Sequence, residues 1–108
     1  MNNVSLIQLI SCSRADKNLA RITHLLHELT PKPKQWVLLP ENALVFGAKE
    51  DYLNASESLG RGPLQSALAE LAQRFNIYLV CGSFPIKSEE AERVYTSSLV
   101  FSPQGELI

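Results

Sequence analysis

The chain has 108 residues, of which 45% are hydrophobic, and its 10 basic and 11 acidic side chains give a formal net charge of -1. This length and composition allow one domain at most, with a buried hydrophobic core, and argue against a disordered chain. The charges form no basic stripe, so nucleic acid is not an expected partner. The apolar runs are far shorter than the roughly 20 residues of a membrane-spanning helix. With no recognisable secretory signal, we expect a cytoplasmic protein without a membrane partner.

The first third of the chain predicts two strands joined by a helix. Val4 to Ile10 carries branched apolar residues on both alternating faces, which is typical of a strand buried on two sides. Beyond Ser13 the hydrophobic period changes to that of a helix. The start of this helix is marked either by Ser13 and Asp16 at capping-box spacing or by Asp16 alone as the cap. Pro31 forbids continuation of that helix, and Trp36 to Leu39 is the second buried strand. The apolar stripe of the helix consists of Leu19, Ile22, Leu25, Leu26 and Leu29.

The middle of the chain predicts a long loop, a second amphipathic helix and a strand pair. Residues 40–62 have no strong period, so we expect a loop with one helical turn around Lys49 to Glu57. Gly62-Pro63 opens the clearest helix of the sequence, because proline suits the first helical position. A third buried strand covers Ile77 to Cys81, and a fourth covers Val94 to Phe101.

The last residues predict a tight turn and the start of a returning strand. Ser102-Pro-Gln-Gly105 has proline at its second position, and Glu106 to Ile108 follows it. The order of strands and helices predicts an α/β fold in which right-handed crossovers lead into antiparallel pairing. A short final strand leaves backbone groups unpaired, so we expect this unit alone to seek a partner chain or to aggregate.

Glu41 is the candidate catalytic residue. It follows Pro40 directly after a buried strand, and open α/β sheets place their ligand crevices at the carboxyl ends of strands. On position alone, a solvated glutamate in a loop is the simpler interpretation. Phe46 and Tyr52 lie in the same long loop, where aromatic side chains either line a substrate pocket or pack the loop against the sheet. Both interpretations stay open.

The other chemically competent residues favour structural roles. Cys12 and Cys81 lie in or beside apolar runs, which indicates reduced, buried thiols rather than a disulfide or a nucleophile. His24 and His27 are three residues apart on the polar face of a helix, and with no third ligand they predict no metal site. Gly60-Arg-Gly-Pro63 lacks the residues of a phosphate-binding loop, so we interpret it as the start of a helix.

The segment Val37-Leu-Leu-Pro-Glu-Asn-Ala-Leu-Val-Phe-Gly47 resembles the first signature of the nitrilase superfamily of carbon-nitrogen hydrolases, in which a strand ends in Leu-Pro-Glu. Collinear similarity extends over the whole chain, through the strand with Gln8, Gly62-Pro63, Ile77 to Ser83 and Tyr95 to Leu107. The segment after Glu41 is similar to the branch that contains omega-amidases and deaminated-glutathione amidases.

This resemblance implies an enzyme that hydrolyses a small-molecule amide or nitrile, an amide giving an acid and ammonia. Glu41 would be the general base beside a cysteine nucleophile and an oxyanion-stabilising lysine. In the family both partners follow the Pro-x-Gly turn, so we expect them beyond Ile108 and expect residues 1–108 alone to be inactive. The implied fold is the N-terminal part of a four-layer α-β-β-α sandwich, and the implied assembly is a homo-oligomer. No metal or organic cofactor is implied.

Two other hypotheses stay open. The chain is either a non-catalytic fragment or interaction module of the same fold, or an unrelated flavodoxin-like binding domain. The flavodoxin-like alternative shares the alternation of strands and helices but not Leu-Pro-Glu at a strand end. A reading frame that continues into a Tyr-x-Lys strand and a cysteine elbow would favour the enzyme over the module.

Overall fold

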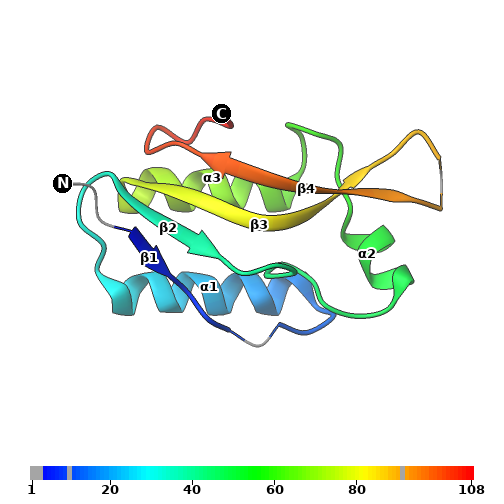
Figure 1. The fold of residues 1–108 in the computed structure, drawn as a ribbon, viewed down its shortest axis with the longest axis horizontal. Helices are drawn as coiled ribbons and strands as arrows, with labels where there is room; N and C mark the ends of the chain where they lie inside the picture. Colours follow the sequence, from blue (N-terminus) through cyan, green and yellow to red (C-terminus); the bar gives the residue numbers. More distant parts are fainter. Residues whose placement is uncertain (1–3, 10, 91) are drawn as a thin grey trace.

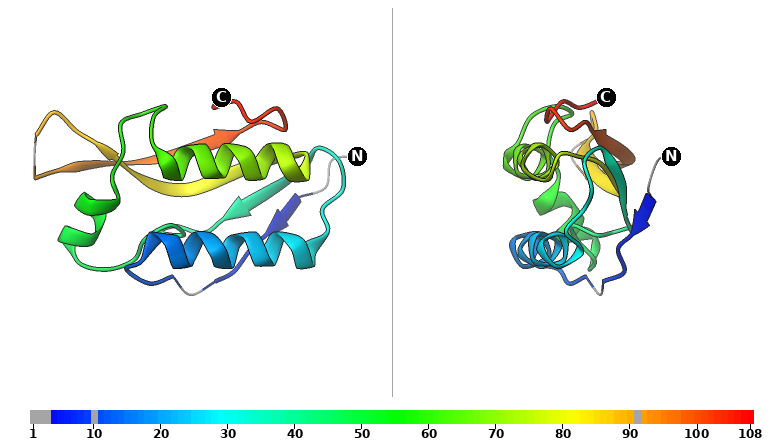
Figure 2. Two further views of the ribbon diagram at one scale, coloured as in Figure 1. Left: turned by 180° about the vertical axis from the view of Figure 1, so that it is seen from behind. Right: turned by 90° about the vertical axis from the view of Figure 1, so that its left-hand side faces the viewer.

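The computed structural model describes residues 4–9, 11–90 and 92–108, which form a four-stranded sheet with two long helices on one of its faces (Figures 1 and 2). The strand order is β1-β2-β3-β4, with the first three strands parallel and β4 antiparallel to β3. The predicted α/β fold class is confirmed. In chain order the elements are β1 (Val4–Leu6), α1 (Ala15–Leu29), β2 (Gln35–Leu39), α2 (Lys49–Ala55), α3 (Pro63–Phe75), β3 (Ile77–Lys87) and β4 (Val94–Phe101).

The hydrophobic core lies between the two long helices and one face of the sheet. Because side chains alternate along a strand, every second residue of β2, and of β3 from Ile77 to Cys81, points to the helices and is buried. The helices contribute one stripe each, as their 3.6-residue period predicts. The buried residues at the centre of this core are Ile22, Leu26, Val37, Leu68, Ile77, Leu79 and Cys81.

The opposite face of the sheet stays open to solvent along β1 and is half-buried along β2 and β3. Trp36 and Tyr78, neighbours in the ladder, stack there with ring centroids 4.4 Å apart. The prediction of a strand over Val4 to Ile10 buried on two sides is wrong: β1 ends at Leu6, whose side chain is 72% exposed. The reason is that β1 is an edge strand and none of the described residues covers its outer face. Ile10, the last residue of the predicted strand, lies outside the described residues.

Helix α1 forms where its apolar stripe predicts it, but neither predicted cap is used. The helix begins at Ala15, and Arg14 is its N-cap residue without a side-chain hydrogen bond. Asp16 instead pairs with Arg14, whose guanidinium holds the pKa of that carboxyl below its ordinary value. At the other end, Thr30 adopts a left-handed conformation and its N–H donates to the carbonyl of Leu26, which closes the helix before Pro31.

The N-terminus of α3 is occupied by a carboxylate from the chain itself. Glu57 is buried, and its carboxylate accepts hydrogen bonds from the backbone N–H groups of Leu64, at 2.7 Å, and Gln65, at 3.0 Å. These are donors that a helix leaves unpaired at its start. The interpretation of Gly62-Pro63 as the start of a helix is therefore confirmed, and a bound phosphate would have to displace Glu57.

The C-terminal elements agree with the sequence patterns, except that β3 is longer than predicted. Beyond Cys81 the strand continues to Lys87 and pairs with β4 after a shift of register. The turn after β4 is closed by the Gly105 N–H, which donates to the carbonyl of Ser102 at 2.8 Å. Leu107 then forms an isolated antiparallel bridge with Phe101, which is the predicted returning segment.

Candidate functional site

Glu41 lies immediately beyond the carboxyl end of β2, and its side chain is exposed. The strand before it is held on both sides by parallel pairing, with β1 through Leu38 and with β3 through Leu39. Pro40 fixes one backbone torsion on the way to Glu41. The position predicted from sequence, at the carboxyl edge of a parallel sheet, is therefore the position that the fold gives this carboxylate.

The backbone ahead of Glu41 is in close contact with Gly82 of β3. A Cβ atom at position 82 would lie 2.7 Å from the carbonyl oxygen of Leu39 and 2.9 Å from the carbonyl carbon of Pro40. Only a residue without a side chain allows this approach, so Gly82 belongs to the support of Glu41. Sequence reasoning assigned Gly82 no role, although a glycine directly after an apolar strand is the kind of signal that marks such a contact.

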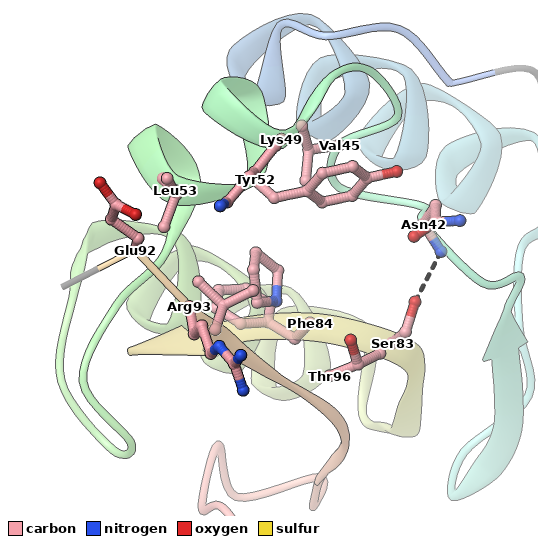
Figure 3. Close-up of a pocket in the computed structure, with 12 residues that line it drawn as sticks. Asn42, Val45, Lys49, Tyr52, Leu53, Ser83, Phe84, Glu92, Arg93 and Thr96 are labelled. Atoms are coloured by element: carbon pink, nitrogen blue, oxygen red, sulfur yellow. Dashed lines mark hydrogen bonds between the residues drawn. The ribbon is translucent and has the colours of Figure 1, made fainter. Parts of the chain in front are cut away.

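Ser83 of β3 holds the backbone after Glu41. Asn42 adopts a left-handed conformation, with φ of 57°, and its N–H donates to Ser83 Oγ at 2.7 Å (Figure 3). Ser83 is buried, with 7% of its surface exposed. Glu41 thus lies between two residues, Pro40 and Asn42, that both contact β3.

The loop beyond Asn42 is tied to the segment that leads into α1. The buried Asn18 donates from Nδ2 to the carbonyl oxygens of Cys12 and Leu44, both at 2.8 Å. The Phe46 N–H donates to the carbonyl of Cys12 at 2.9 Å. Residues 43–45 are buried under these contacts, so the long loop is packed against the fold along its first half. Asn18 was not foreseen, because its partner Leu44 is 26 positions away in sequence.

A cavity of about 530 Å³ opens beside this loop (Figure 3). Tyr52 of α2 forms one wall and Phe84 of β3 lies across from it, so Tyr52 is placed where a pocket residue would be. Phe46 does not line this cavity, and its side chain is 59% exposed. The lining residues are Asn42, Val45, Lys49, Tyr52, Leu53, Ser83, Phe84, Pro85, Glu92, Arg93, Val94 and Thr96.

Glu41 is not itself among the lining residues, but its neighbour Asn42 is. Glu41 is therefore one residue away from the cavity lining along the chain. The charged residues of the lining are exposed, and Arg93 forms an ion pair with Glu90 at 3.2 Å. A mostly apolar wall with a few polar groups is typical of small-molecule sites.

Neither cysteine of the chain has the surroundings of a nucleophile. Burial raises the pKa of the Cys81 thiol to about 12, so at neutral pH it stays protonated. Cys12 is exposed, which corrects the expectation that both thiols are buried, and its thiol donates to Asn18 Oδ1 at 3.4 Å.

Across the residues that the structure describes, no three His, Cys, Asp or Glu side chains gather as metal ligands. Within the same residues, no helix combines the length and apolarity needed to span a bilayer.

The Carbon-nitrogen hydrolase family profile matches residues 3–108, which is almost the whole chain. The chain belongs to this family. Among curated relatives, it is 40% identical over 106 residues to the deaminated glutathione amidase of Yersinia enterocolitica and 33% identical over 107 residues to the omega-amidase NIT2 of Homo sapiens. Both alignments cover 97% of this chain and 37% of the relative. The predicted resemblance to the omega-amidase branch of the nitrilase superfamily is confirmed. The chain spans little more than a third of the length of these two relatives.

Solved structures show the same fold. Nit3 of Saccharomyces cerevisiae, a member of branch 10 of the nitrilase superfamily, superposes with a TM-score of 0.83 at 25% identity, over 99% of this chain and 42% of that one. An N-terminal amidase crystallised with a Gln-Val peptide superposes with a TM-score of 0.77 at 28% identity, over 95% and 25% of the two chains. The sheet and helices of this chain therefore form part of a nitrilase-like fold.

Proposed function

We propose that the chain is the N-terminal portion of a carbon-nitrogen hydrolase that converts a small-molecule amide to a carboxylic acid and ammonia or an amine, with Glu41 as general base. The observation that carries this proposal is the placement of Glu41 at the carboxyl end of β2, between two residues that β3 holds, next to a mostly apolar cavity. The amidases among its relatives support the reaction class.

The proposed chemistry needs three groups, of which this chain supplies one. Glu41 accepts the proton of a cysteine thiol as the sulfur attacks the amide carbon, and a lysine stabilises the negative charge on the oxygen. The C–N bond breaks, the leaving nitrogen takes the proton from Glu41 and departs as ammonia or an amine, and a thioester remains. Glu41 then takes a proton from water as the water oxygen attacks the thioester carbon. The C–S bond breaks, the acid leaves, and the proton on Glu41 passes to the sulfur and regenerates the thiol. We place the nucleophile and the lysine outside residues 1–108, as the family resemblance implies, and Cys81 stays protonated in the core.

We assign the cavity beside Asn42 to the substrate, with Tyr52 as one of its walls. Phe46 remains a candidate pocket residue on the exposed side of the same loop. The substrate class follows from the relatives: an omega-amide or deaminated glutathione, rather than a nitrile, is the expected substrate. We further propose that the enzyme is a cytoplasmic homo-oligomer, as the sequence alone implies.

Hydrolysis of a panel of substrates tests this proposal, measured as ammonia release or, for deaminated glutathione, as release of the amine on the other side of its amide bond. The protein that carries this chain is incubated with an omega-amide of a dicarboxylic acid, deaminated glutathione, a simple nitrile and a peptide with N-terminal glutamine. We expect turnover of at least one of the first two and little or none of the nitrile. Release from the peptide alone would place the enzyme with the N-terminal amidases, and no release from any of the four would contradict the proposal.

A non-catalytic module is the second candidate, and the uncovered apolar face of the sheet favours it. Such a module would use that face to bind a partner. The mass of the protein isolated from its natural source separates the two. A mass well above 12.0 kDa, with a lysine and a cysteine motif after Ile108, favours the enzyme, whereas a mass of about 12.0 kDa favours the module.

A further inference from the structure

We infer that Ser83 is a positioning residue for Glu41: its hydroxyl holds the peptide that follows the catalytic carboxylate. The inference rests on the proposed function and extends it to a residue 42 positions away in sequence. Its basis is the hydrogen bond from the Asn42 N–H to Ser83 Oγ at 2.7 Å. The Glu41 side chain is exposed, so the backbone on its two sides sets the direction from which it reaches a substrate.

The pairing of β3 with β4 aims Ser83 at this peptide. Cys81 pairs with Leu99 and Phe84 pairs with Ser97, so β3 has one residue more than β4 across this interval. Such a bulge bends the strand and turns side chains out of their normal alternation, and bulges are frequent beside active sites. Here Gly82 approaches the end of β2, and Ser83, directly after it, meets Asn42. Both buried contacts come from one irregularity in one strand.

The conformation of Asn42 explains why it needs an anchor. A left-handed backbone is unfavourable for a residue with a side chain, although asparagine tolerates it better than most. At φ of 57°, Asn42 turns the chain sharply after Glu41. Without the Ser83 hydroxyl, the Asn42 N–H would lose its acceptor at a buried position. The turn would then relax, and the Glu41 carboxylate would shift with it.

A small shift of this carboxylate is expected to affect turnover more than binding. Catalytic groups need to stand within about 0.5 Å of their working position, and a displacement of about 1 Å can cost roughly 100-fold in rate. The substrate is held mainly by cavity walls from α2, β3 and β4, which a relaxed Asn42 turn leaves in place, and Asn42 itself is a small part of the lining. The kcat should fall while KM changes little. If Ser83 instead contacted the substrate directly, its loss would raise KM.

The test compares S83A, S83T and S102A in the full protein that carries this chain. S83A removes the acceptor, whereas S83T keeps the hydroxyl, and Ser83 lines the cavity, which leaves space for the extra methyl group. S102A is the matched control, because Ser102 is also buried and its hydroxyl also accepts from backbone N–H groups, those of Gln104 and Glu106 at 3.2 Å, in the turn after β4. E41Q is measured alongside.

We expect S83A to lower kcat by about 10- to 100-fold with KM within about twofold of the wild type. S83T should recover most of the lost kcat, and S102A should leave kcat unchanged. A wild-type kcat in S83A, or a loss that appears mainly in KM, would overturn the inference while E41Q remained inactive. An active E41Q would instead remove the proposed role of Glu41 itself. If S83A fails to fold, S83T is compared with a folded Ser83→Val variant, which lacks the hydroxyl. Normal turnover by S83T supports the inference. A loss of turnover in S83T equal to that in Ser83→Val contradicts it.

Discussion

At the scale of single residues, Cys12 and Cys81 differ in exposure, and this difference sets their reactivity. Cys12 is exposed, and Cys81 lies in the core with a thiol pKa raised by burial to about 12. We expect iodoacetamide at pH 8 to modify Cys12 in the folded protein and to leave Cys81 intact, because the thiolate is the reactive form. Peptide mapping by mass spectrometry reads out each site. Equal modification of both cysteines would contradict the burial of Cys81.

The same thiol predicts how stability changes with pH. In the unfolded chain the thiol ionises near its ordinary pKa of 9.0, whereas in the folded chain it stays protonated up to about 12. The unfolded state therefore gains by losing a proton above pH 9, so the free energy of unfolding falls between pH 9 and pH 12 and is unaffected below. Urea unfolding at pH 8 and pH 10 measures the fall. A Cys81→Ala variant should show a smaller decrease, and an equal decrease would exclude Cys81 as its source.

The sequence was informative about Glu41 and much less so about the residues that hold it. Glu41 follows an apolar strand and a proline, which are local signals, and the family resemblance added the rest. Ser83 and Asn18 act across 41 and 26 positions of sequence, on Asn42 and Leu44. No periodicity or motif pairs residues at such distances, because the pairing depends on how the strands and helices come together.

At the scale of elements, α3 depends on a carboxylate that lies before it in the chain. Glu57 accepts hydrogen bonds from two backbone N–H groups at the start of the helix. We expect Glu57→Ala to lower the free energy of unfolding by about 2 kcal/mol, since buried donors would lose a charged acceptor. Chemical denaturation measures the change. Glu70→Ala, at an exposed position of the same helix, is the control and should stay within about 0.5 kcal/mol. Equal effects of the two variants would contradict the capping role.

The predicted elements succeeded where periodicity and stop signals agreed. The two long helices have complete apolar stripes and end at Thr30 and Asn76, both in a left-handed conformation. The prediction for β1 was wrong. A run of apolar residues shows that both faces of a strand are suited to burial, but it does not show that another element covers each face. The extension of β3 past Cys81 was missed, because Gly82 and Pro85 are residues that interrupt most strands.

At the scale of the whole molecule, the sheet has one face covered by helices and one face open (Figure 2). The open face carries the stacked Trp36 and Tyr78 and the exposed Leu6. We expect residues 1–108, produced alone, to self-associate through this apolar surface as concentration rises. Light scattering after size-exclusion chromatography measures the mass. Leu6→Asp should reduce association, whereas Leu59→Asp, at an exposed leucine in the loop before α3, should not. A monomer at every concentration would contradict the expectation.

The central claim is that Glu41 is the general base of an amidase, and one comparison tests it most directly. Ammonia release is measured for the full protein that carries this chain, with its preferred amide, for the wild type, Glu41→Gln and Glu70→Gln. We predict that Glu41→Gln keeps the wild-type circular dichroism spectrum and unfolding midpoint but loses turnover, because an amide cannot accept the thiol proton. Glu70→Gln should behave as the wild type. Near-normal turnover by a folded Glu41→Gln protein would contradict the claim.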